Sequence, residues 1–240
     1  MDADVLRSGI HPFGLPLPGD PATGWRRHPL FAGPTGLLDF LGCHVSVLGP
    51  GATPHPPHVH EDEEILLMLD GEADLAYGAS SAAAAGERLR PGRFIHYPAG
   101  CFHTLSNPGP RDATYLMFRW RAAEPSRAGR ALPRGTTDFA VAPEARRPGG
   151  DGFDVTVLVE GPTRHLGRLH VHSTVLHPGC GYAPHADAHD VAIVTLAGEV
   201  ETLGRRVPAH AAIFYAAGEP HGMANPGGSP AVYLVFEFHR

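Results

Sequence analysis

The chain contains no lysine, so all 19 of its basic residues are arginine. This absence excludes Schiff-base catalysis and any lysine general base. Cysteine is scarce as well: Cys43, Cys101 and Cys180 are too few and too scattered for a disulfide framework or a zinc ribbon. No apolar run approaches the roughly 20 residues that a membrane-spanning helix needs, and we expect no membrane partner.

Several signatures of function are also missing. Neither a GxSxG nucleophile elbow nor a glycine-rich phosphate loop occurs, and no segment resembles a DNA-binding helix-turn-helix. The formal net charge of −6, with no basic stripe, predicts no nucleic-acid partner. The opening "MDADVLRSGI" lacks the basic region and long apolar stretch of a secretory signal, so we expect a cytoplasmic protein.

Short β-type runs, punctuated by 30 glycines and 25 prolines, recur along the chain. Helical periodicity is almost absent. An all-β sandwich or barrel is therefore predicted. The predicted strands are "HVSVL" (44–48), "EILLML" (64–69), "RFIHY" (93–97), "TYLMF" (114–118), "DVTVLV" (154–159), "VAIVTL" (191–196), "AIFYA" (212–216) and "VYLVF" (232–236).

The sequence repeats itself in four ordered blocks. Residues 32–51 align with 160–179, 67–72 with 194–199, 97–109 with 215–227, and 113–120 with 231–238. The offset falls from about 128 to 118 across "GASSAAAAGE" (78–87), which indicates a longer loop in the first copy. The Pro-, Gly- and Arg-rich segment 122–150 reads as a linker. We therefore predict an N-terminal barrel at 1–121, a linker at 122–150 and a C-terminal barrel at 151–240.

Histidine is abundant, with 17 copies, and three of them crowd into "PHPPHVHEDEEILLMLDGE" (54–72). His58, His60 and Glu64 follow the spacing H-x-H-x3-E. Residues two apart in a strand project to one face, so His58 and His60 are expected to point together, with Glu64 beginning the next strand. His103 would arrive from a separate strand. Three imidazoles and one carboxylate make a mixed nitrogen and oxygen site for a divalent transition metal.

These spacings resemble the two signature motifs of the cupin superfamily. The first motif is matched apart from one extra residue between Gly51 and His58. The second, G-x5-P-x-G-x2-H-x3-N, is matched at every position, by Gly92, Pro98, Gly100, His103 and Asn107. The resemblance covers about residues 24–120 and 152–240. It implies two tandem jelly-roll (double-stranded β-helix) barrels, a bicupin, with metal ligands at His58, His60, Glu64 and His103.

Residues beside the motif are given simpler roles. Glu61, Asp62 and Glu63 are interpreted as turn and surface residues, and His55 as a loop residue outside the ligand set. His44 and His172 occupy equivalent positions in the two copies and are interpreted as packing groups or partners of ligands. By alternation, three apolar side chains fall on the ligand-bearing face and would form the floor of a substrate pocket: Leu66, Met68 and Leu105.

The second copy has lost part of this set. At the four ligand positions it carries His185, Asp187, Val191 and His221, and valine cannot bind a metal. A weak second metal site remains an alternative, formed by His185, Asp187, His189 and His221. The favoured interpretation is that the second barrel is structural.

The complete set predicts one divalent transition metal per chain, with Fe(II) favoured and Mn, Ni, Zn, Co or Cu also compatible. Four ligands leave two adjacent octahedral positions open, and the site charge of about +1 favours small anionic or enolisable substrates. The leading hypothesis is a dioxygenase, with dioxygen as second substrate. The alternative is an oxygen-independent isomerase or epimerase, decarboxylase or aminohydrolase. A third is a small-molecule binding or sensor protein with a structural metal.

The sequence identifies no catalytic residue beyond the ligands. Jelly-roll barrels expose edge strands that need covering, and members of the superfamily commonly pair barrels. We therefore expect a homo-oligomer.

Overall fold

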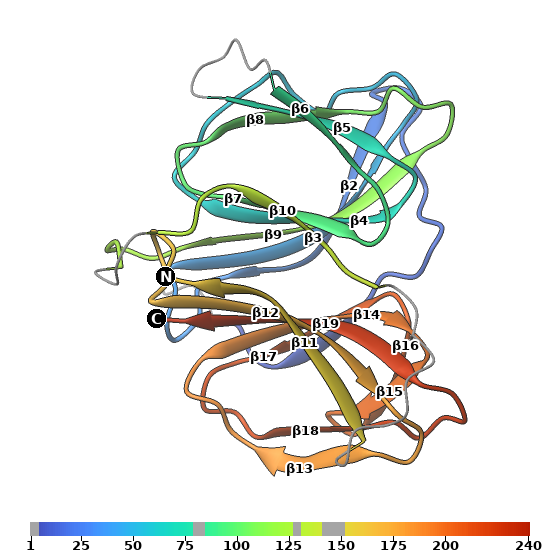
Figure 1. Cartoon of the computed structure of the whole chain (residues 1–240), viewed down its shortest axis with the longest axis vertical. Helices are drawn as coiled ribbons and strands as arrows, with labels where there is room; N and C mark the ends of the chain where they lie inside the picture. Colours follow the sequence, from blue (N-terminus) through green and yellow to red (C-terminus); the bar gives the residue numbers. More distant parts are fainter. Residues whose placement is uncertain (1–4, 79–84, 127–130, 141–151) are drawn as a thin grey trace.

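The computed structural model describes residues 5–78, 85–126, 131–140 and 152–240. Within these ranges the chain forms nineteen strands and no helix, which confirms the all-β prediction. No helix in the described ranges is therefore long and apolar enough to cross a membrane. Figure 1 shows two barrels stacked along the long axis, the first in blue to green and the second in yellow to red.

Each barrel consists of one six-stranded sheet facing a smaller one, with all hydrogen-bonded neighbours antiparallel. In the first barrel the larger sheet runs β10 (Gly135–Asp138), β7 (Arg93–Tyr97), β4 (Glu63–Asp70), β9 (Ala113–Arg121), β3 (Phe40–Leu48), β2 (Trp25–Gly33). Its smaller sheet runs β6 (Ala85–Leu89), β5 (Ala73–Gly78), β8 (Phe102–Ser106).

The second barrel repeats this order of strands. Its larger sheet runs β1 (Gly9–Pro12), β17 (Ala211–Tyr215), β14 (Asp190–Ala197), β19 (Ala231–His239), β12 (Arg168–Leu176), β11 (Phe153–Gly161). Its smaller sheet runs β13 (Gly181–His185), β18 (His221–Ala224), β15 (Glu199–Thr202), β16 (Arg205–Pro208). Seven of the eight predicted strands lie wholly within these elements, and the eighth, "AIFYA" (212–216), extends one residue past the end of β17. The two tandem jelly-roll barrels are confirmed.

The two large sheets pack face to face between the barrels, so both faces of their central strands are buried. In β4, Ile65 and Leu67 face the other barrel, whereas Leu66 and Met68 face the interior of the first. Burial on both faces explains why the strand reads as a continuous apolar run rather than an alternating one.

Aromatic side chains form the centre of this contact. Phe118 lies with its ring centroid 5.0 Å from that of Phe236, and Trp120 meets Phe238 edge-on at 5.5 Å. Such pairs add about 0.5–1.5 kcal/mol each beyond the area they bury. The barrels therefore share one core between them, and each keeps a second core inside.

The repeated motif asparagine closes the same turn in both barrels. Asn107 donates from its side-chain nitrogen to the carbonyl of Leu48 at 2.8 Å, and Asn225 donates to the carbonyl of Leu176 at 2.8 Å. Gly71 has a φ of 70°, and a Cβ there would lie 2.4 Å from the carbonyl oxygen of Asp112. The motif positions shared by both copies thus serve the fold.

The structure corrects the predicted domain boundaries. Residues 9–12, assigned to the first barrel, form β1, which pairs with β17 of the second. Residues 135–138, assigned to the linker, form β10, which pairs with β7 of the first barrel. Each barrel thereby covers one sheet edge with a segment that precedes the other barrel. Residues 127–130 and 141–151 of the predicted linker, and 79–84 of the predicted longer loop, lie outside the described residues.

Candidate metal centre

The predicted ligands of the first barrel come from three different segments. Glu64 is the second residue of β4, His103 lies in β8, and His58 and His60 lie in the irregular segment before β4. A strand at residues 58–60 was therefore predicted wrongly. Prolines have no N–H to donate to a ladder, and "PHPPH" leaves only an isolated bridge in which the amides of His58 and His103 donate to each other's carbonyls at 3.2 and 3.1 Å.

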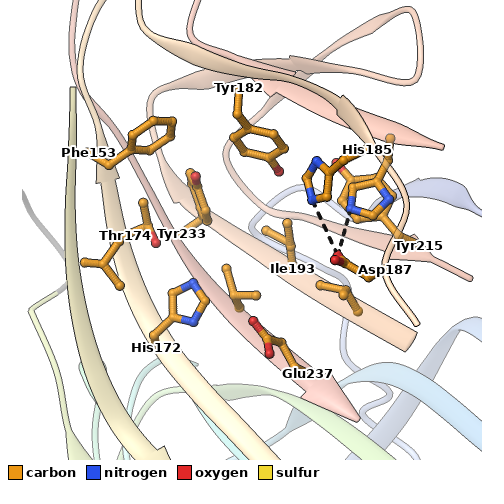
Figure 2. Close-up of a pocket in the computed structure, with 14 residues that line it drawn as sticks. Phe153, His172, Thr174, Tyr182, His185, Asp187, Ile193, Tyr215, Tyr233 and Glu237 are labelled. Atoms are coloured by element: carbon orange, nitrogen blue, oxygen red, sulfur yellow. Dashed lines mark ion pairs between the residues drawn. The ribbon is translucent and has the colours of Figure 1, made fainter. Parts of the chain in front are cut away.

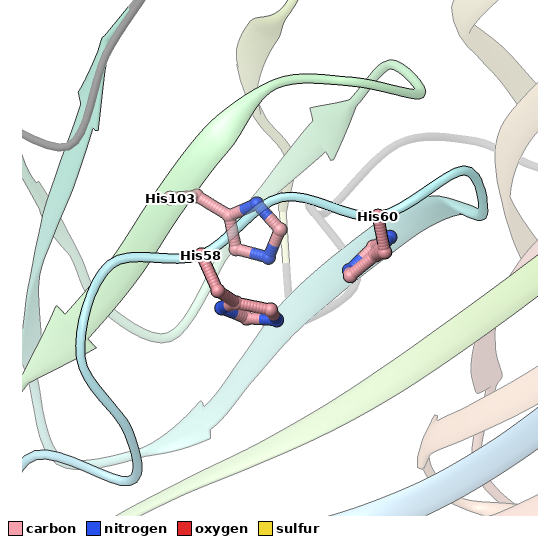
Figure 3. Close-up of side chains that lie close together, drawn as sticks. All are labelled: His58, His60 and His103. Atoms are coloured by element: carbon pink, nitrogen blue, oxygen red, sulfur yellow. The ribbon is translucent and has the colours of Figure 1, made fainter.

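The structure brings the four side chains together. Nε2 of His60 lies 3.0 Å from Oε1 of Glu64, and Nε2 of His103 lies 3.0 Å from its Oε2. One nitrogen from each of His58, His60 and His103 lies within 4.8 Å of the others. Figure 3 shows these three rings gathered around a common point.

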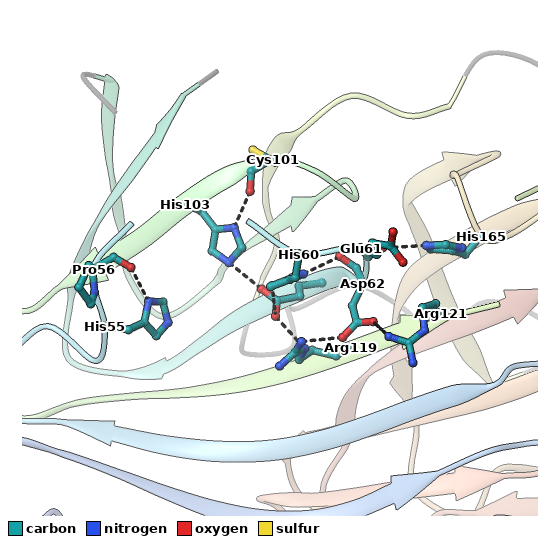
Figure 4. Close-up of polar contacts among 11 residues, drawn as sticks. His55, Pro56, His60, Glu61, Asp62, Cys101, His103, Arg119, Arg121 and His165 are labelled. Atoms are coloured by element: carbon teal, nitrogen blue, oxygen red, sulfur yellow. Dashed lines mark hydrogen bonds and ion pairs between the residues drawn. The ribbon is translucent and has the colours of Figure 1, made fainter. Parts of the chain in front are cut away.

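Backbone carbonyls orient two of the imidazoles (Figure 4). Nδ1 of His60 lies 3.0 Å from the carbonyl of Asp62, and Nδ1 of His103 lies 2.9 Å from that of Cys101. A carbonyl only accepts, so the ring proton belongs on Nδ1 and each Nε2 turns a lone pair toward Glu64. A hydrogen-bond acceptor that contacts the other ring nitrogen commonly fixes the tautomer of a metal-binding histidine.

The ligand atoms face one another without hydrogen bonding. Although the contacts with Glu64 are short, Nε2 of His60, Oε2 of Glu64 and Nδ1 of His58 are buried and have no well-aligned partner among the described residues. Ligand atoms at right angles around an ion with bonds of about 2.1 Å lie about 3.0 Å apart. Converging lone pairs at this spacing fit a divalent transition metal, whose positive charge would satisfy all of them.

The electrostatics favour the metal-binding forms of His58 and Glu64. For His60, burial lowers the pKa, but the carboxylate of Glu64 outweighs it and raises that pKa. Burial, with the neighbouring charges of His55 and His103, lowers the pKa of His58 to about 4, so its ring is neutral at pH 7. Burial raises the pKa of Glu64, but His103 and His60 outweigh it and hold that pKa below its usual range. Neutral imidazoles and an ionised carboxylate are the forms that bind metals.

An arginine pair that sequence reasoning missed holds the turn between His60 and Glu64. Arg119 on β9 lies 3.1 Å from Glu64 and 2.6 Å from Asp62, and Arg121 lies 2.9 Å from Asp62. In the sequence, Arg119 can be recognised as a charged residue within the otherwise apolar run "TYLMFRWR" (114–121). Asp62 is only 6% exposed, so its interpretation as a surface residue was wrong.

Glu63 is a larger correction, because it is completely buried between the barrels. Its carboxylate accepts from the hydroxyl of Thr163, the amides of Arg164 and His165, and the indole of Trp120. Glu61 is exposed, as predicted, and its carbonyl lies 2.8 Å from Nε2 of His165. The second barrel therefore holds the segment between two predicted metal ligands of the first.

A cavity of about 120 Å³ opens beside three of the four predicted ligand side chains, those of His58, Glu64 and His103. Leu66 and Leu105 line it as predicted, but Met68 does not, because it lies one pleat repeat farther along β4 in the same buried cluster. His55 lies in a loop as predicted, yet its side chain lines the cavity as well. The other lining residues are Trp25, Arg27, His44, His58, Glu64, Tyr97, His103, Tyr115, Met117 and Arg119.

The second barrel brings only part of its predicted set together. His185, Asp187 and His221 offer ligand atoms within 4.8 Å of one another, and Val191 lines the same cavity. His189 is separate from them and lies 3.4 Å from Glu237. The sequence assigned no role to Glu237, although it stands where the first copy has Arg119.

Comparison with known proteins identifies one domain family. Residues 44–119 match the model of the Cupin_2 family, described as a cupin domain. No curated protein sequence matches the chain.

Solved structures share the fold of the whole chain. A Pseudomonas aeruginosa protein described as glyoxylate-induced has a TM-score of 0.71 at 17% identity, covering 91% of this chain and 82% of that one. Protein YlbA of E. coli gives 0.67 at 15% identity, covering 98% and 93%. A variant of Bacillus subtilis oxalate decarboxylase gives 0.67 at 12% identity, covering 99% and 79%.

Proposed function

Because the chain belongs to the cupin superfamily, we propose that its first barrel is a metal-dependent dioxygenase that oxidises a small carboxylate. One observation carries the proposal: His58, His60, Glu64 and His103 converge at the wall of a cavity that also presents arginine side chains, and all of them but His60 line it. The three imidazoles and one carboxylate would hold one divalent ion, with iron favoured.

Arg27 supports a carboxylate as the substrate. Arg119 already pairs with Asp62 and Glu64, whereas Arg27 on β2 lines the cavity and forms no ion pair within the described residues. A guanidinium binds a carboxylate through two parallel hydrogen bonds. Arg27 would hold the carboxylate end of the substrate while Leu66 and Leu105 exclude water from the rest of it.

Two ionisable residues of the lining, His44 and Tyr115, are poor groups for proton transfer. Burial lowers the pKa of His44 to about 3, and burial raises that of Tyr115 to about 12, so neither exchanges protons readily near pH 7. A ferrous ion in such a donor set supplies the activation of dioxygen. When both oxygen atoms enter the products, the reaction needs no external reductant.

A decarboxylase or isomerase that works without dioxygen is the second candidate, and His55 favours it. Its ring is the one imidazole of the described cavity lining, apart from the ligands and the buried His44, and it lies 4.0 Å from the ring of His58. It could give or take a proton at the substrate. Oxalate decarboxylase among the structural neighbours is consistent with this chemistry.

The test loads the purified protein with iron under nitrogen and measures oxygen uptake with small 2-oxo acids, dicarboxylates and catechols. Substrate-dependent uptake, with label from ¹⁸O₂ in the product, supports the dioxygenase. Arg27→Gln should then raise KM at least tenfold with little change in kcat. Turnover under nitrogen that His55→Ala abolishes selects the second candidate. Stoichiometric metal without turnover of any compound leaves a binding or sensor protein.

A further inference from the structure

The cavity of the second barrel is the larger of the two, at about 230 Å³ against about 120 Å³. Three tyrosines line it, and no arginine does within the described part of the chain. Figure 2 shows His172 and Glu237 close together at one side, apart from His185 and Asp187 at the other. The two groups of ligand-type residues therefore belong to different ends of one cavity.

Glu237 occupies a special place in the large sheet. It is the register partner of Val191 on β14 and of His170 on β12, so its side chain shares a face with both. His172 follows two residues along β12 and lies on that face too. Ligand atoms from His170, His172 and Glu237 lie within 4.8 Å of one another.

His170 is oriented as a metal ligand would be. Its Nδ1 lies 2.7 Å from the carboxylate of Glu160, which fixes the ring proton on that nitrogen. The other nitrogen, Nε2, therefore keeps its lone pair. A carboxylate that accepts from a histidine in this way commonly sets the orientation and basicity of a metal-binding imidazole.

His172 adds an independent observation. Its Nδ1 is buried and has no hydrogen-bond partner among the described residues, an arrangement that is costly for a polar atom. The histidines on the other side of Glu237 are less available. Nε2 of His239 lies 2.7 Å from the carboxylate of Glu237 and 2.8 Å from the guanidinium of Arg168, while the rings of His189 and His239 stack at 3.7 Å.

We propose that His170, His172 and Glu237 form a second, exchangeable metal centre for a divalent transition ion such as Zn²⁺. The donor set, two imidazoles and one carboxylate, suits zinc, iron, cobalt or nickel. It lies outside the positions that correspond to the ligands of the first barrel. With three ligands instead of four, all partly exposed, it should bind more weakly than the first centre and fill only when free metal is added.

A comparison of equivalent residues in the two copies supports this metal site in the second barrel. Where the second barrel has His170 and Glu237, the first has Gly42 and Arg119, a pair that cannot bind a cation. His172 and Glu237 both line the cavity. A bound ion would give this arginine-free cavity a positive charge for binding a small anion or hydroxyl compound.

The experiment uses the full chain with Glu64→Val, which removes the first centre, after dialysis against a chelator. Calorimetric titration with Zn²⁺ should show one remaining equivalent, against two for the unmodified chain. Adding His170→Gln or Glu237→Gln should weaken that equivalent at least tenfold. The matched control, His185→Gln at the other end of the cavity, should leave it unchanged.

Two results overturn the proposal. One is the absence of any zinc binding by the Glu64→Val chain. The other is binding that His185→Gln abolishes while His170→Gln leaves it intact, which would place the ion at His185, Asp187 and His221. Because the readout is metal stoichiometry, failure of this proposal is distinct from failure of the proposed dioxygenase. Circular dichroism and thermal unfolding of each variant establish that the fold is retained.

Discussion

The two barrels differ most at one pair of neighbouring strand positions. In the first, Glu64 on β4 is the register partner of Arg119 on β9; in the second, Val191 on β14 is the partner of Glu237 on β19. The carboxylate of Glu237 therefore lies on the strand next to the one that corresponds to the strand of Glu64, about 4.8 Å across the sheet. The order of strands is unchanged, but Val191 leaves the set of His185, Asp187 and His221 without a fourth ligand, and Glu237 lies with His170 and His172 instead.

The carboxylates between the barrels differ in a related way. Glu63 and Asp190 occupy equivalent positions, and both are completely buried. Glu63 accepts four hydrogen bonds, three of them from the other barrel, whereas Asp190 accepts one amide hydrogen bond, from Ala217 of its own barrel, and has the side chain of Thr35 from the other barrel beside it. The carboxylate with more hydrogen bonds, Glu63, stands next to the predicted metal ligand Glu64. The second barrel therefore contributes to the first centre by holding its ligand segment.

The largest expected effect comes from making the first barrel resemble the second. Glu64→Val removes the only anionic ligand while keeping a residue that suits a strand. Metal affinity should fall at least 100-fold and turnover should be lost, because the three imidazoles no longer have a carboxylate to complete the set. Elemental analysis of the purified variant measures the first effect.

The control for this change is Val191→Ala, which alters the equivalent position of the second barrel. It should leave the metal content of the first barrel as it is. Glu64→Val also leaves Arg119 without one of its two partners, so a modest fall in the free energy of unfolding, about 1–3 kcal/mol, is expected. A Glu64→Val protein with full metal occupancy and turnover would contradict the assignment.

The second prediction tests the anchor between the barrels. Thr163→Val removes the hydroxyl that donates to Glu63 and leaves a buried carboxylate oxygen with fewer partners. The loss should cost about 1–3 kcal/mol of unfolding free energy. Because Glu64 follows Glu63 directly, metal affinity should also fall, by roughly tenfold. Urea unfolding and chelator competition measure the two effects.

Thr35→Val is the matched control, since Thr35 is the equivalent residue in the first barrel and lies beside Asp190. It should change stability without changing metal affinity, because no ligand of the first centre follows Asp190. Equal losses of affinity in Thr163→Val and Thr35→Val would show that general loosening of the barrels, and not the anchor, is responsible.

The contacts that bury Glu63 between the barrels could not be predicted from the sequence. Apolar runs and repeated blocks predicted the strands and both barrels, because these depend on local pattern. The spacing of His58, His60, Glu64 and His103 predicted a cluster that the structure brings together. Glu63 was misinterpreted because its burial depends on a second barrel packing against β4. The exchange of β1 and β10 had no local signal either, since edge pairing depends on which strand ends lie nearby.

A smaller effect concerns pH and His44. Burial, together with the charge of Arg27, lowers the pKa of His44 to about 3, below the value near 6.5 of an unfolded chain. Between these values the unfolded state binds a proton that the folded state does not, so stability is full above about pH 6.5 and falls as pH drops toward 3. In metal-free protein, His44→Gln should therefore show a weaker dependence of unfolding free energy on pH between 7 and 5. Urea titrations at the two pH values give that difference, and parallel losses in both proteins would contradict it.

The last prediction concerns the exposed edges of the two large sheets. In the second barrel, β11 leaves Val155 and Val157 more than half exposed, at 56% and 55%. The equivalent edge strand of the first barrel, β2, carries Arg26 and Arg27 and is interrupted by Pro29, features that protect an edge from pairing.

We therefore expect the chain to form a homo-oligomer in which β11 is covered, because an apolar, unpaired edge strand favours association. Val157→Asp should shift the protein toward monomer in light scattering, since a charge at the contact would have to be desolvated. Its free energy of unfolding should change by no more than about 0.5 kcal/mol, as for other exposed positions. Arg26→Asp on β2 is the control and should leave the oligomer unchanged. If the unmodified chain is a strict monomer at working concentration, the exposed valines of β11 have another role, and the difference between the two edges carries no information about assembly.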